Sequence, residues 1–363
     1  MDKKEVSGMK KRTAKKRIPA WIYVLLVVIL AAATIWQARQ NEAEQVEENR
    51  QVLPVDGTLT VRFLDVGQGD SALIVCNGQT MLIDGGSVSE GQFLVSRLSR
   101  LGVSELDYVV NTHPDEDHCG GLAGVLAKYP AEHVYSSVTE HTTKVFSNVV
   151  KYAEEQGRQI EVPQTGDSWY VGDAAVTCIG PVGTYSDSNN GSLVLRVDFG
   201  ETSFLFTGDM EQNAEADLMD SGANVRADVL KVGHHGSPTS SSEAFLEAVA
   251  PSIAVISVGE DNDYGHPSAD VLARLEALGA AIYRTDTQGE IIITSDGQTL
   301  TVTTDPTSRE PAAGKDAPFI GNRNSMIVHS ANCAKLPGED NRVYFNTAEE
   351  AEEYGYQKHT CIK

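Results

Sequence analysis

Short apolar runs separated by turn residues dominate the chain from residue 59 onward. Runs of about four to eight residues predict strands, and apolar positions repeating every three to four residues predict helices. Asn77-Gly78 predicts a tight turn between two of the strands. In the first half the predicted strands are 59–66, 72–76, 80–83 and 108–111, and the predicted helices are 92–101 and 122–129.

The second half repeats this alternation of strands and helices. Two similar mixed halves predict an α/β (α+β) fold in which two sheets pack together with helices outside. The predicted strands of this half are 194–199, 203–207, 229–232, 253–258, 281–284 and 290–294, and its helices are 210–221, 242–249 and 269–278.

One long apolar run precedes this pattern. Residues 18–36 form 19 consecutive positions without a charge, which is long enough to cross a bilayer as a helix. Eight Lys and Arg in residues 1–17 come before the run, and glutamates follow it. The positive-inside rule therefore predicts a single-pass cell-membrane protein with a cytoplasmic N-terminus and an extracytoplasmic body. A cleaved signal peptide, with Ala31-Ala32-Ala33 before the cut, is the alternative, and the body would then be secreted.

These patterns divide the 363 residues into more than one minimal domain. The expected organisation is a basic segment 1–17, a transmembrane anchor 18–36, a polar linker 37–58, a main domain 59–305, a second linker 306–318 and a small unit 319–363.

The net charge of the chain limits the kinds of molecule that it can bind. The formal net charge is −22, and it becomes −28 once residues 1–17 are set aside. Such a body repels polyanions at long range, so binding of nucleic acid would need local basic patches or bound cations. The alternative is that the acidity only keeps an exported domain soluble. Five cysteines, an odd and sparse number, do not indicate a disulfide framework, and Cys76 and Cys178 lie in strand-like runs and are expected to be buried.

The highest density of metal-binding residue types lies at 112–118, directly after the strand at 108–111. On a tight loop, His113 and Asp115 can point one way and Asp117 and His118 another. Two divalent cations would then lie about 3.5–4 Å apart, as in two-metal hydrolases. Imidazole with carboxylate suits zinc, manganese or iron better than calcium or magnesium. The alternative is a solvated loop that is rich in Asp and His.

Four further strand ends carry candidate residues. Asp84 can orient a metal-binding histidine, or simply belong to a turn. Asp209 can bridge two cations, or cap the next helix. The pair His234-His235 can supply another ligand, or lie on the surface, and His266 is suited to touch substrate or leaving group.

The joint order His-x-Asp-x-Asp-His, Gly-Asp and His-His resembles the metallo-β-lactamase fold superfamily, and more closely the extracellular metallo-hydrolase domain of ComEC-type DNA-uptake (competence) proteins. No segment resembles the multispan channel of those proteins, so the chain looks like a stand-alone relative. The resemblance implies an αββα sandwich with a two-metal site between the sheets. The resembling segments are 64–70, 82–86, 112–121, 207–209, 230–237 and 264–267, within 59–304.

The resemblance also implies a ligand set. The superfamily's commonest loop has His where this chain has Asp115, which weakens the inference that the metal is zinc and keeps manganese as the other expectation. The superfamily has a further ligand before the bridging Asp, and the matching region here offers Asn189, Asn190 or Ser192. By the motif, His113 and Asp115 hold one metal, Asp117, His118 and His235 hold the other, and Asp209 bridges them.

The chemistry expected of such a site is hydrolysis. Two cations lower the pKa of a bridging water towards neutrality, and Asp117 helps to position it. His234 or His266 donates to the leaving oxygen, and Lys231 contacts an anionic substrate.

The predicted function is therefore that of a membrane-anchored extracytoplasmic phosphodiesterase or nuclease with DNA among its substrates. The alternatives are a hydrolase of a small ester or head-group phosphodiester and a non-catalytic metal-binding module that captures DNA or partners. No protein partner is inferred.

The last 45 residues hold two further pairs of metal-binding residue types. His329 and Cys333 are one pair, and His359 and Cys361 are the other. Four such ligands can bind one structural zinc, and the segment resembles the zinc-binding module of Ada-type proteins, which often ends with two cysteines instead. The alternative is a small αβ unit in which 343–345 and a helix at 347–354 pack without metal.

Overall fold

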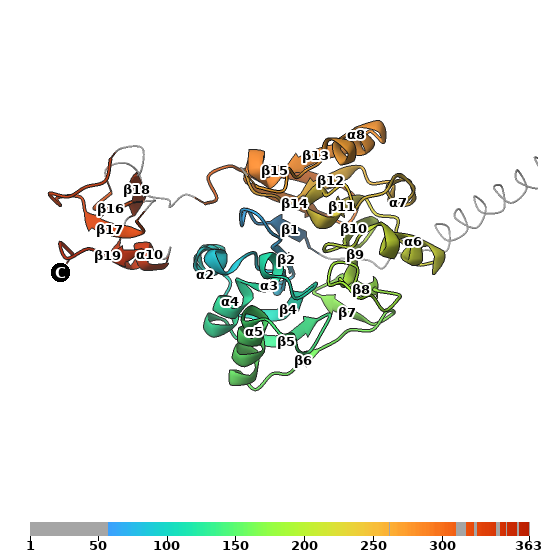
Figure 1. Cartoon of the computed structure of the whole chain (residues 1–363), viewed down its shortest axis with the longest axis horizontal. Helices are drawn as coiled ribbons and strands as arrows, with labels where there is room; N and C mark the ends of the chain where they lie inside the picture. The colour runs from blue at the N-terminus through green and yellow to red at the C-terminus, as the bar shows by residue number, and fades with distance from the viewer. Residues whose placement is uncertain are drawn as a thin grey trace, which may run out of the picture. The chain divides into compact units, whose positions relative to one another are not determined.

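Two facing β-sheets form the main body of the chain, as the computed structural model shows (Figure 1). The structure describes residues 57–260, 262–309, 317–322, 325–338, 342–345, 347–353 and 356–362. The basic segment 1–17, the predicted anchor 18–36 and nearly all of the linker 37–58 lie outside the described residues. Among the described residues, no helix combines the length and the apolar character needed to cross a membrane.

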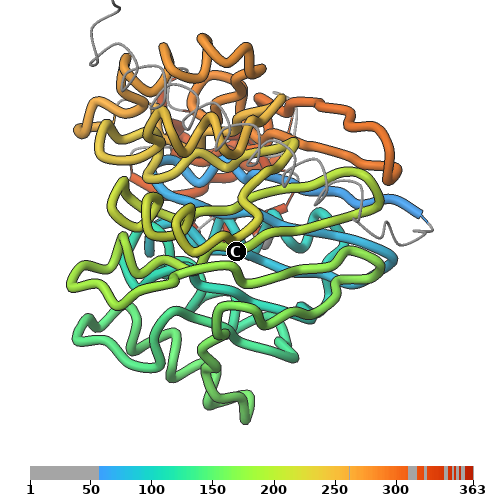
Figure 2. Tube along the Cα trace, turned by 90° about the vertical axis from the view of Figure 1, so that its right-hand side faces the viewer, coloured from blue at the N-terminus to red at the C-terminus, as the bar shows by residue number. Residues whose placement is uncertain are grey.

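The first sheet has eight strands, with β1 near its middle. β1 pairs antiparallel with β14 on one side and β2 on the other, so the N-terminal strand lies beside one from the end of the body (Figure 2). From β3 to β6 neighbouring strands are parallel. The strand order is β15 (Leu300–Asp305), β14 (Glu290–Ser295), β1 (Leu59–Phe63), β2 (Ala72–Cys76), β3 (Gln79–Ile83), β4 (Leu106–Asn111), β5 (Ala131–Ser136) and β6 (Ile160–Glu161).

The second sheet has seven strands. Strands β10 to β13 run parallel, while β7 to β10 form an antiparallel meander. The strand order is β13 (Ala281–Arg284), β12 (Ile253–Ile256), β11 (Val229–Lys231), β10 (Thr202–Phe206), β9 (Val194–Phe199), β8 (Ala174–Gly180) and β7 (Ser168–Val171).

Helices cover the outer face of each sheet, which gives the αββα order expected from the sequence. One apolar cluster lies between the sheets, where Phe63 and Phe206 stack with ring centroids 5.8 Å apart. A second joins the first sheet to α2, α4 and α5, and a third joins the second sheet to α6, α7 and α8. The helices of the body are η1 (Val88–Glu90), α2 (Gly91–Arg100), α3 (Glu116–Cys119), α4 (Leu122–Lys128), α5 (Lys144–Glu155), α6 (Gln212–Asp220), η2 (Gly233–Gly236), α7 (Glu243–Val249), α8 (Ala269–Ala277) and α9 (Thr285–Gln288).

The elements that the sequence analysis did not predict lie mostly between residues 131 and 180. β5 and the edge strand β7 have polar or exposed positions among their apolar ones, which hides the strand pattern. Helix α5 begins at an ordinary cap, because the Thr143 hydroxyl accepts a hydrogen bond from the Phe146 N–H. β15 is only partly buried and was also not predicted.

A buried ionic group joins three neighbouring strands at one edge of the first sheet to helix α2. Glu290 on β14 is fully buried, and its two oxygens lie 2.7 Å from Arg62 Nη1 on β1 and 2.7 Å from Arg97 Nε on α2. Arg97 also contacts Asp305 at 3.1 Å. Because each charge has partners of opposite sign, the group satisfies the condition for burying ions.

A third, four-stranded sheet belongs to the C-terminal segment. Its small core contains Val328, Phe345, Ala351 and Tyr356, and the predicted strand at 343–345 lies within β18. The strand order of this third sheet is β18 (Arg342–Phe345), β16 (Phe319–Asn322), β17 (Ile327–Ser330) and β19 (Gln357–Lys358), with helix α10 (Ala348–Glu353) beside it.

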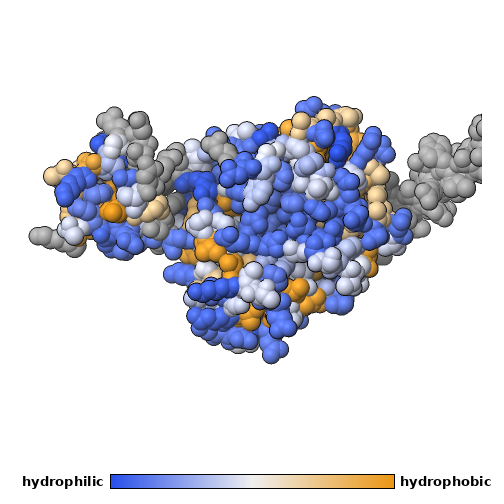
Figure 3. Space-filling view, in the orientation of Figure 1, coloured by the Kyte–Doolittle hydropathy of each residue, from blue (hydrophilic) through white to orange (hydrophobic). Residues whose placement is uncertain are grey.

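The face of the main body seen in Figure 3 is largely hydrophilic.

Candidate metal centre

Strand ends from both sheets bring the predicted ligands together. The loop after β4 of the first sheet carries His113 and Asp115, and the short helix α3 then carries Asp117 and His118. Asp209 follows β10 and His235 follows β11, both in the second sheet. The site therefore lies where the carboxyl ends of these strands meet.

Asp209 is the centre of this cluster. Its Oδ1 lies 3.2 Å from His118 Nε2, and its Oδ2 lies 3.5 Å from His235 Nε2 and 4.0 Å from His113 Nε2. The carboxylate is buried. The preceding Gly208 has a positive φ of 51°, and a Cβ there would approach Ser192 Oγ to 2.9 Å. Glycine is thus required for the turn that presents Asp209.

The ligand-type atoms at this centre have no hydrogen-bond partner among the described residues. They are the Nε2 atoms of His113, His118 and His235 and the Oδ1 atom of Asp209, all of them buried. Buried polar atoms are normally hydrogen-bonded, so three orphaned imidazole nitrogens around a carboxylate with an orphaned oxygen of its own need an explanation. Imidazole nitrogen and carboxylate oxygen are donors that divalent transition metals accept, and the residues present therefore fit bound cations.

The opposite nitrogen of each imidazole is held by the protein. Asp84 Oδ2 lies 2.9 Å from His118 Nδ1, and the Ser257 carbonyl oxygen lies 2.9 Å from His235 Nδ1. Because carboxylate and carbonyl only accept, both Nδ1 atoms carry the proton and donate it. This leaves the Nε2 lone pairs free for a metal. His113 Nδ1 lies 3.1 Å from the Thr112 hydroxyl.

Asp84 itself is tightly held behind His118. Its Oδ1 accepts hydrogen bonds from the Thr112 N–H at 2.7 Å and the Asn111 amide at 3.2 Å. Its Oδ2 accepts from the Thr112 hydroxyl at 2.7 Å. The arrangement is that of a carboxylate that orients a ligand from behind, the first role that the sequence analysis considered for Asp84.

Charge pairing shifts the pKa values of the cluster in opposite directions. Burial and the neighbouring His118 lower the pKa of His113 to about 4. Although burial opposes it, Asp209 and Asp70 raise the pKa of His235 to about 9, and Asp209 and Asp84 raise that of His118 well above its usual value. Burial also opposes ionisation of Asp209, but His118 and His235 hold its pKa far below the usual range.

Asp115 and Asp117 lie at the rim. Their side chains are 40% and 36% exposed. Asp115 Oδ2 is 3.8 Å from His113 Nε2, and Asp117 Oδ2 is 3.2 Å from His235 Nε2. The structure thus places Asp115 beside His113 and Asp117 beside His235, in the two groups that the motif implies.

His234 also reaches the centre. Its Nε2 lies 3.6 Å from Asp209 Oδ2, and its Nδ1 lies 3.2 Å from Glu211 Oε1. Both His234 and His235 have positive φ, 48° and 52°, a conformation that costs energy for non-glycine residues and occurs mainly at functional sites. His266 adjoins His234, with ring centroids 5.6 Å apart.

Lys231 requires a correction. It is buried, and its ammonium is in direct contact with Asp70 Oδ2, so the prediction that it contacts an anionic substrate is wrong. Asp70 is a residue that the sequence analysis missed. Its Oδ1 lies 3.3 Å from His235 Nδ1, and its Oδ2 lies 3.9 Å from His118 Nδ1. The sequence feature that could have identified Asp70 is its position as a carboxylate two residues before the buried strand β2.

In the region 188–195, Asn190 and Ser192 make hydrogen bonds within the protein. Asn190 Oδ1 accepts hydrogen bonds from the N–H groups of Glu211 and Ala214 at the start of α6. Ser192 Oγ lies 3.3 Å from Nδ1 of His113 and accepts the Asp209 N–H at 3.1 Å, and Asn189 accepts the Ser192 N–H through its carbonyl. The fourth imidazole beside Asp209 is His234.

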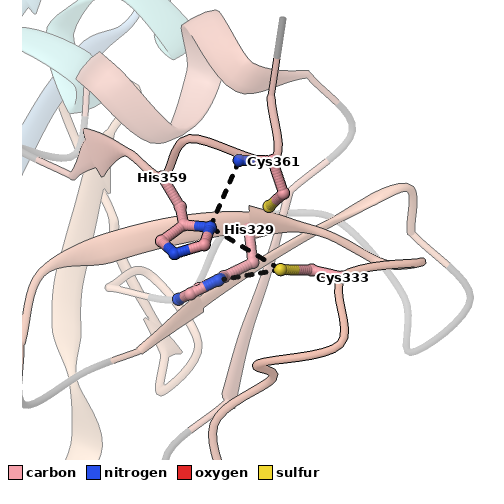
Figure 4. Close-up of side chains that lie close together, drawn as sticks. All are labelled: His329, Cys333, His359 and Cys361. Carbon is pink, nitrogen blue, oxygen red and sulfur yellow. Dashed lines mark hydrogen bonds between the residues drawn. The ribbon is translucent and has the colours of Figure 1, made fainter.

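A second cluster lies in the C-terminal segment (Figure 4). Parallel pairing of β17 with β19 brings His329 next to His359, with ring centroids 4.3 Å apart. Cys333 Sγ lies 3.4 Å from His329 Nδ1 and 3.6 Å from His359 Nδ1. One ligand atom from each of these residues and from Cys361 lies within 4.8 Å of the others, and all five cysteines of the chain are free thiols.

Known proteins match the main body. A family model described as the Metallo-beta-lactamase superfamily matches residues 64–260. ComE operon protein 3 of Bacillus subtilis (strain 168) is 32% identical over 64% of this chain and 32% of its own length. Competence protein ComA of Neisseria gonorrhoeae is 36% identical over 64% of this chain and 31% of its own length, so the chain spans about a third of these relatives. The crystal structure of the metallo-beta-lactamase fold protein YhfI from Bacillus subtilis has a TM-score of 0.47 and 11% identity, covering 65% of this chain and 100% of that chain.

Proposed function

This chain belongs to the metallo-β-lactamase superfamily and is a metal-dependent hydrolase, and from that premise we propose that it hydrolyses phosphodiesters, DNA among them, at a two-metal centre. The observation that carries the proposal is the set of three orphaned imidazole Nε2 atoms around Asp209. DNA is proposed because relatives that match this domain are named for competence.

His113 and Asp115 would hold one cation, Asp117, His118 and His235 would hold the other, and Asp209 lies between the two groups. Zinc and manganese suit this mixture of imidazole and carboxylate. Bound there, the cations supply a water of lowered pKa and stabilise negative charge on the phosphoryl oxygens. Asp84 and Ser257 keep two of the imidazoles in the orientation that this requires.

The remaining polar groups serve the substrate. Asp117 is half exposed and reaches the centre from the rim, so it is placed to orient the attacking water. His234, with Glu211 at its Nδ1, is a donor to the leaving oxygen. His266 lies against His234 and has an orphaned, buried Nδ1, which makes it a second donor or acceptor there.

The test is metal content and turnover of the full chain. Asp209→Asn preserves the shape of the side chain but removes the charge, and we expect the full chain to hold about one ion fewer than wild type and its turnover to fall at least 100-fold. Asp296→Asn, in the turn before β15, is the matched control and should behave as wild type. Wild-type protein that holds no metal after zinc and manganese reconstitution would overturn the proposal.

The substrate panel separates the alternatives. Plasmid DNA, bis-p-nitrophenyl phosphate and a phospholipid head-group diester are compared on the same metal-loaded protein. Turnover of DNA supports the nuclease function, whereas turnover of the small esters alone supports the head-group alternative. Full metal occupancy with no turnover of any of the three substrates favours the non-catalytic module.

We propose in addition that the C-terminal cluster holds one structural zinc. Two imidazoles and two thiols within reach of one point are a common zinc donor set. Mass spectrometry should find one zinc fewer in Cys333→Ser than in wild type, while the ions of the main site remain. Equal metal content in both proteins contradicts this site.

The membrane anchor is a proposal from the charge asymmetry around 18–36. It predicts that the full chain sediments with membranes, that removal of 1–36 releases it, and that external protease reaches the body. N-terminal sequencing that finds a start after residue 33 favours the secreted alternative.

A further inference from the structure

Tyr264 presents an aromatic ring to solvent at the mouth of the site. Its side chain is 71% exposed, the highest value among the exposed large apolar residues described. The ring stacks on His266 with centroids 5.7 Å apart and planes 24° from parallel. Most of the residue remains accessible to a ligand despite this contact.

A continuous line of side chains leads from Tyr264 to the metal-binding carboxylate. His266 lies against Tyr264 on one side and His234 on the other. His234 Nε2 is 3.6 Å from Asp209 Oδ2. Tyr264 is thus connected to Asp209 through two intervening imidazoles.

The loop that carries the ring is held in place. The Asn262 amide donates to the carbonyl oxygens of Gly259 and His266, at 3.0 and 2.7 Å. Its Oδ1 accepts from the N–H groups of Tyr264 and His266, at 3.2 and 3.0 Å. A loop backbone that is held before binding loses less conformational entropy when a ligand stacks on the ring that it carries.

The charges of the site disfavour binding of a nucleic-acid backbone through basic side chains, which is the usual mode of binding. Lys231 is neutralised by Asp70, and the chain as a whole carries a net charge of −22. Neither Lys231 nor the overall charge therefore favours attraction of a polyanion to this centre. Stacking on an aromatic ring is an alternative that needs no cationic side chain, and every base offers a flat face.

We propose that Tyr264 is a stacking platform for a nucleobase next to the scissile bond, so that the substrates of this site are nucleotidyl phosphodiesters with unpaired bases. The inference rests on the proposed phosphodiesterase function and names its substrate class. Unpaired bases are available in single-stranded nucleic acid and in short oligonucleotides, whereas a duplex keeps its bases stacked on one another.

The test compares a thymidine dinucleotide with two analogues in which one or the other base is absent, using the metal-loaded full chain. Wild type should show a kcat/KM at least about tenfold higher for the complete dinucleotide than for one of the analogues. Tyr264→Ala should bring this ratio close to one, and Tyr264→Phe should keep it because the ring remains. Tyr170→Ala, which removes an exposed ring on β7, should also keep the wild-type ratio.

A binding measurement separates failure of this inference from failure of the proposed function. Fluorescence anisotropy in chelator compares oligothymidine with an abasic strand of equal length, so no turnover is needed. Weaker binding of oligothymidine to Tyr264→Ala than to wild type supports the platform even if no phosphodiester is hydrolysed.

Equal treatment of base-containing and abasic ligands by wild type overturns the platform, whether or not the esters are cleaved. Because the abasic analogues retain the sugar, this result would mean that any contact with the Tyr264 ring is made by the sugar and not by the base. Comparison of the dinucleotide with a single-stranded oligonucleotide shows which source of unpaired bases is preferred.

Discussion

In three imidazoles around Asp209 (His118, His235 and His113) the protein holds Nδ1, and Nε2 faces the reaction centre. Nδ1 is bonded to Asp84, to the Ser257 carbonyl and to Thr112, respectively, and Nε2 has no hydrogen-bond partner within the described part of the chain. Second contacts of this kind set the tautomer and the direction of the free lone pair. A change behind a ligand should therefore weaken metal binding without removing any ligand.

Asp84→Asn tests this effect. The amide nitrogen cannot accept the hydrogen bonds that Asp84 takes from Thr112 and His118, so the His118 ring loses its orientation. We expect metal affinity to fall about 10–100-fold, measured by competition with a chromophoric chelator. Asp296→Asn serves as control. Unaltered affinity in Asp84→Asn would show that His118 does not depend on this contact.

The pKa values of His118 and His235 predict how the metal-free protein responds to pH. Both are raised in the folded chain, that of His235 to about 9, so protonation stabilises the fold. This stability is fully present below the unfolded value, about 6.5, and is lost as pH rises towards 9. His113, with its pKa lowered to about 4, is neutral in the folded chain across this range, and in the unfolded chain it loses its remaining charge just above pH 6.5.

We therefore expect the Tm of chelator-treated protein to fall between pH 6.5 and 9, measured by thermal unfolding. His235→Asn, which lacks this protonation, should show a smaller fall. A Tm of the metal-free protein that rises over the same range is the contrary result.

Among the elements, α4 depends on a close backbone approach at its first turn. A Cβ at Gly121, the cap of α4, would meet the Gly85 carbonyl oxygen at 2.1 Å. Gly85 follows β3 and precedes the helical segment η1. The N-terminus of α4 thus packs against the segment that follows β3, which also contains Asp84.

Gly121→Ala should destabilise the fold by about 1–3 kcal/mol, as overpacking does. Gly124→Ala is the matched control in the same helix, because its Cβ would meet its nearest neighbour at an ordinary 3.6 Å. That change should be neutral or stabilise by up to about 1 kcal/mol through helix propensity. Chemical denaturation measures both variants, and equal stabilities would contradict the backbone approach.

At the scale of the whole molecule, the ligands come from both sheets. His113 and His118 follow β4 in the first sheet, and Asp209 and His235 follow β10 and β11 in the second. Cations bound there would link the two sheets of the sandwich. Binding to the folded state alone raises stability by mass action.

Metal removal should consequently lower the Tm of the full chain. With free zinc at about 100 times its Kd, binding contributes about 2.7 kcal/mol, which corresponds to roughly 5–10 °C for a body of this size. Calorimetry with and without chelator measures the difference, and Asp209→Asn should lose most of it. Equal metal-induced shifts in wild type and Asp209→Asn would place the stabilising ion elsewhere, for example at Cys333.

The sequence by itself determined the layered fold class, most strands and helices, and the residue types at the centre. It could do so because hydrophobic periodicity and the spacing of His113 to His118 are local properties of the chain. The pairing of β1 with β14, the burial of Lys231 against Asp70, and the use of Asn190 as a helix cap were decided only by tertiary structure. These contacts join segments far apart along the chain, and their energy depends on which groups folding brings together and removes from water.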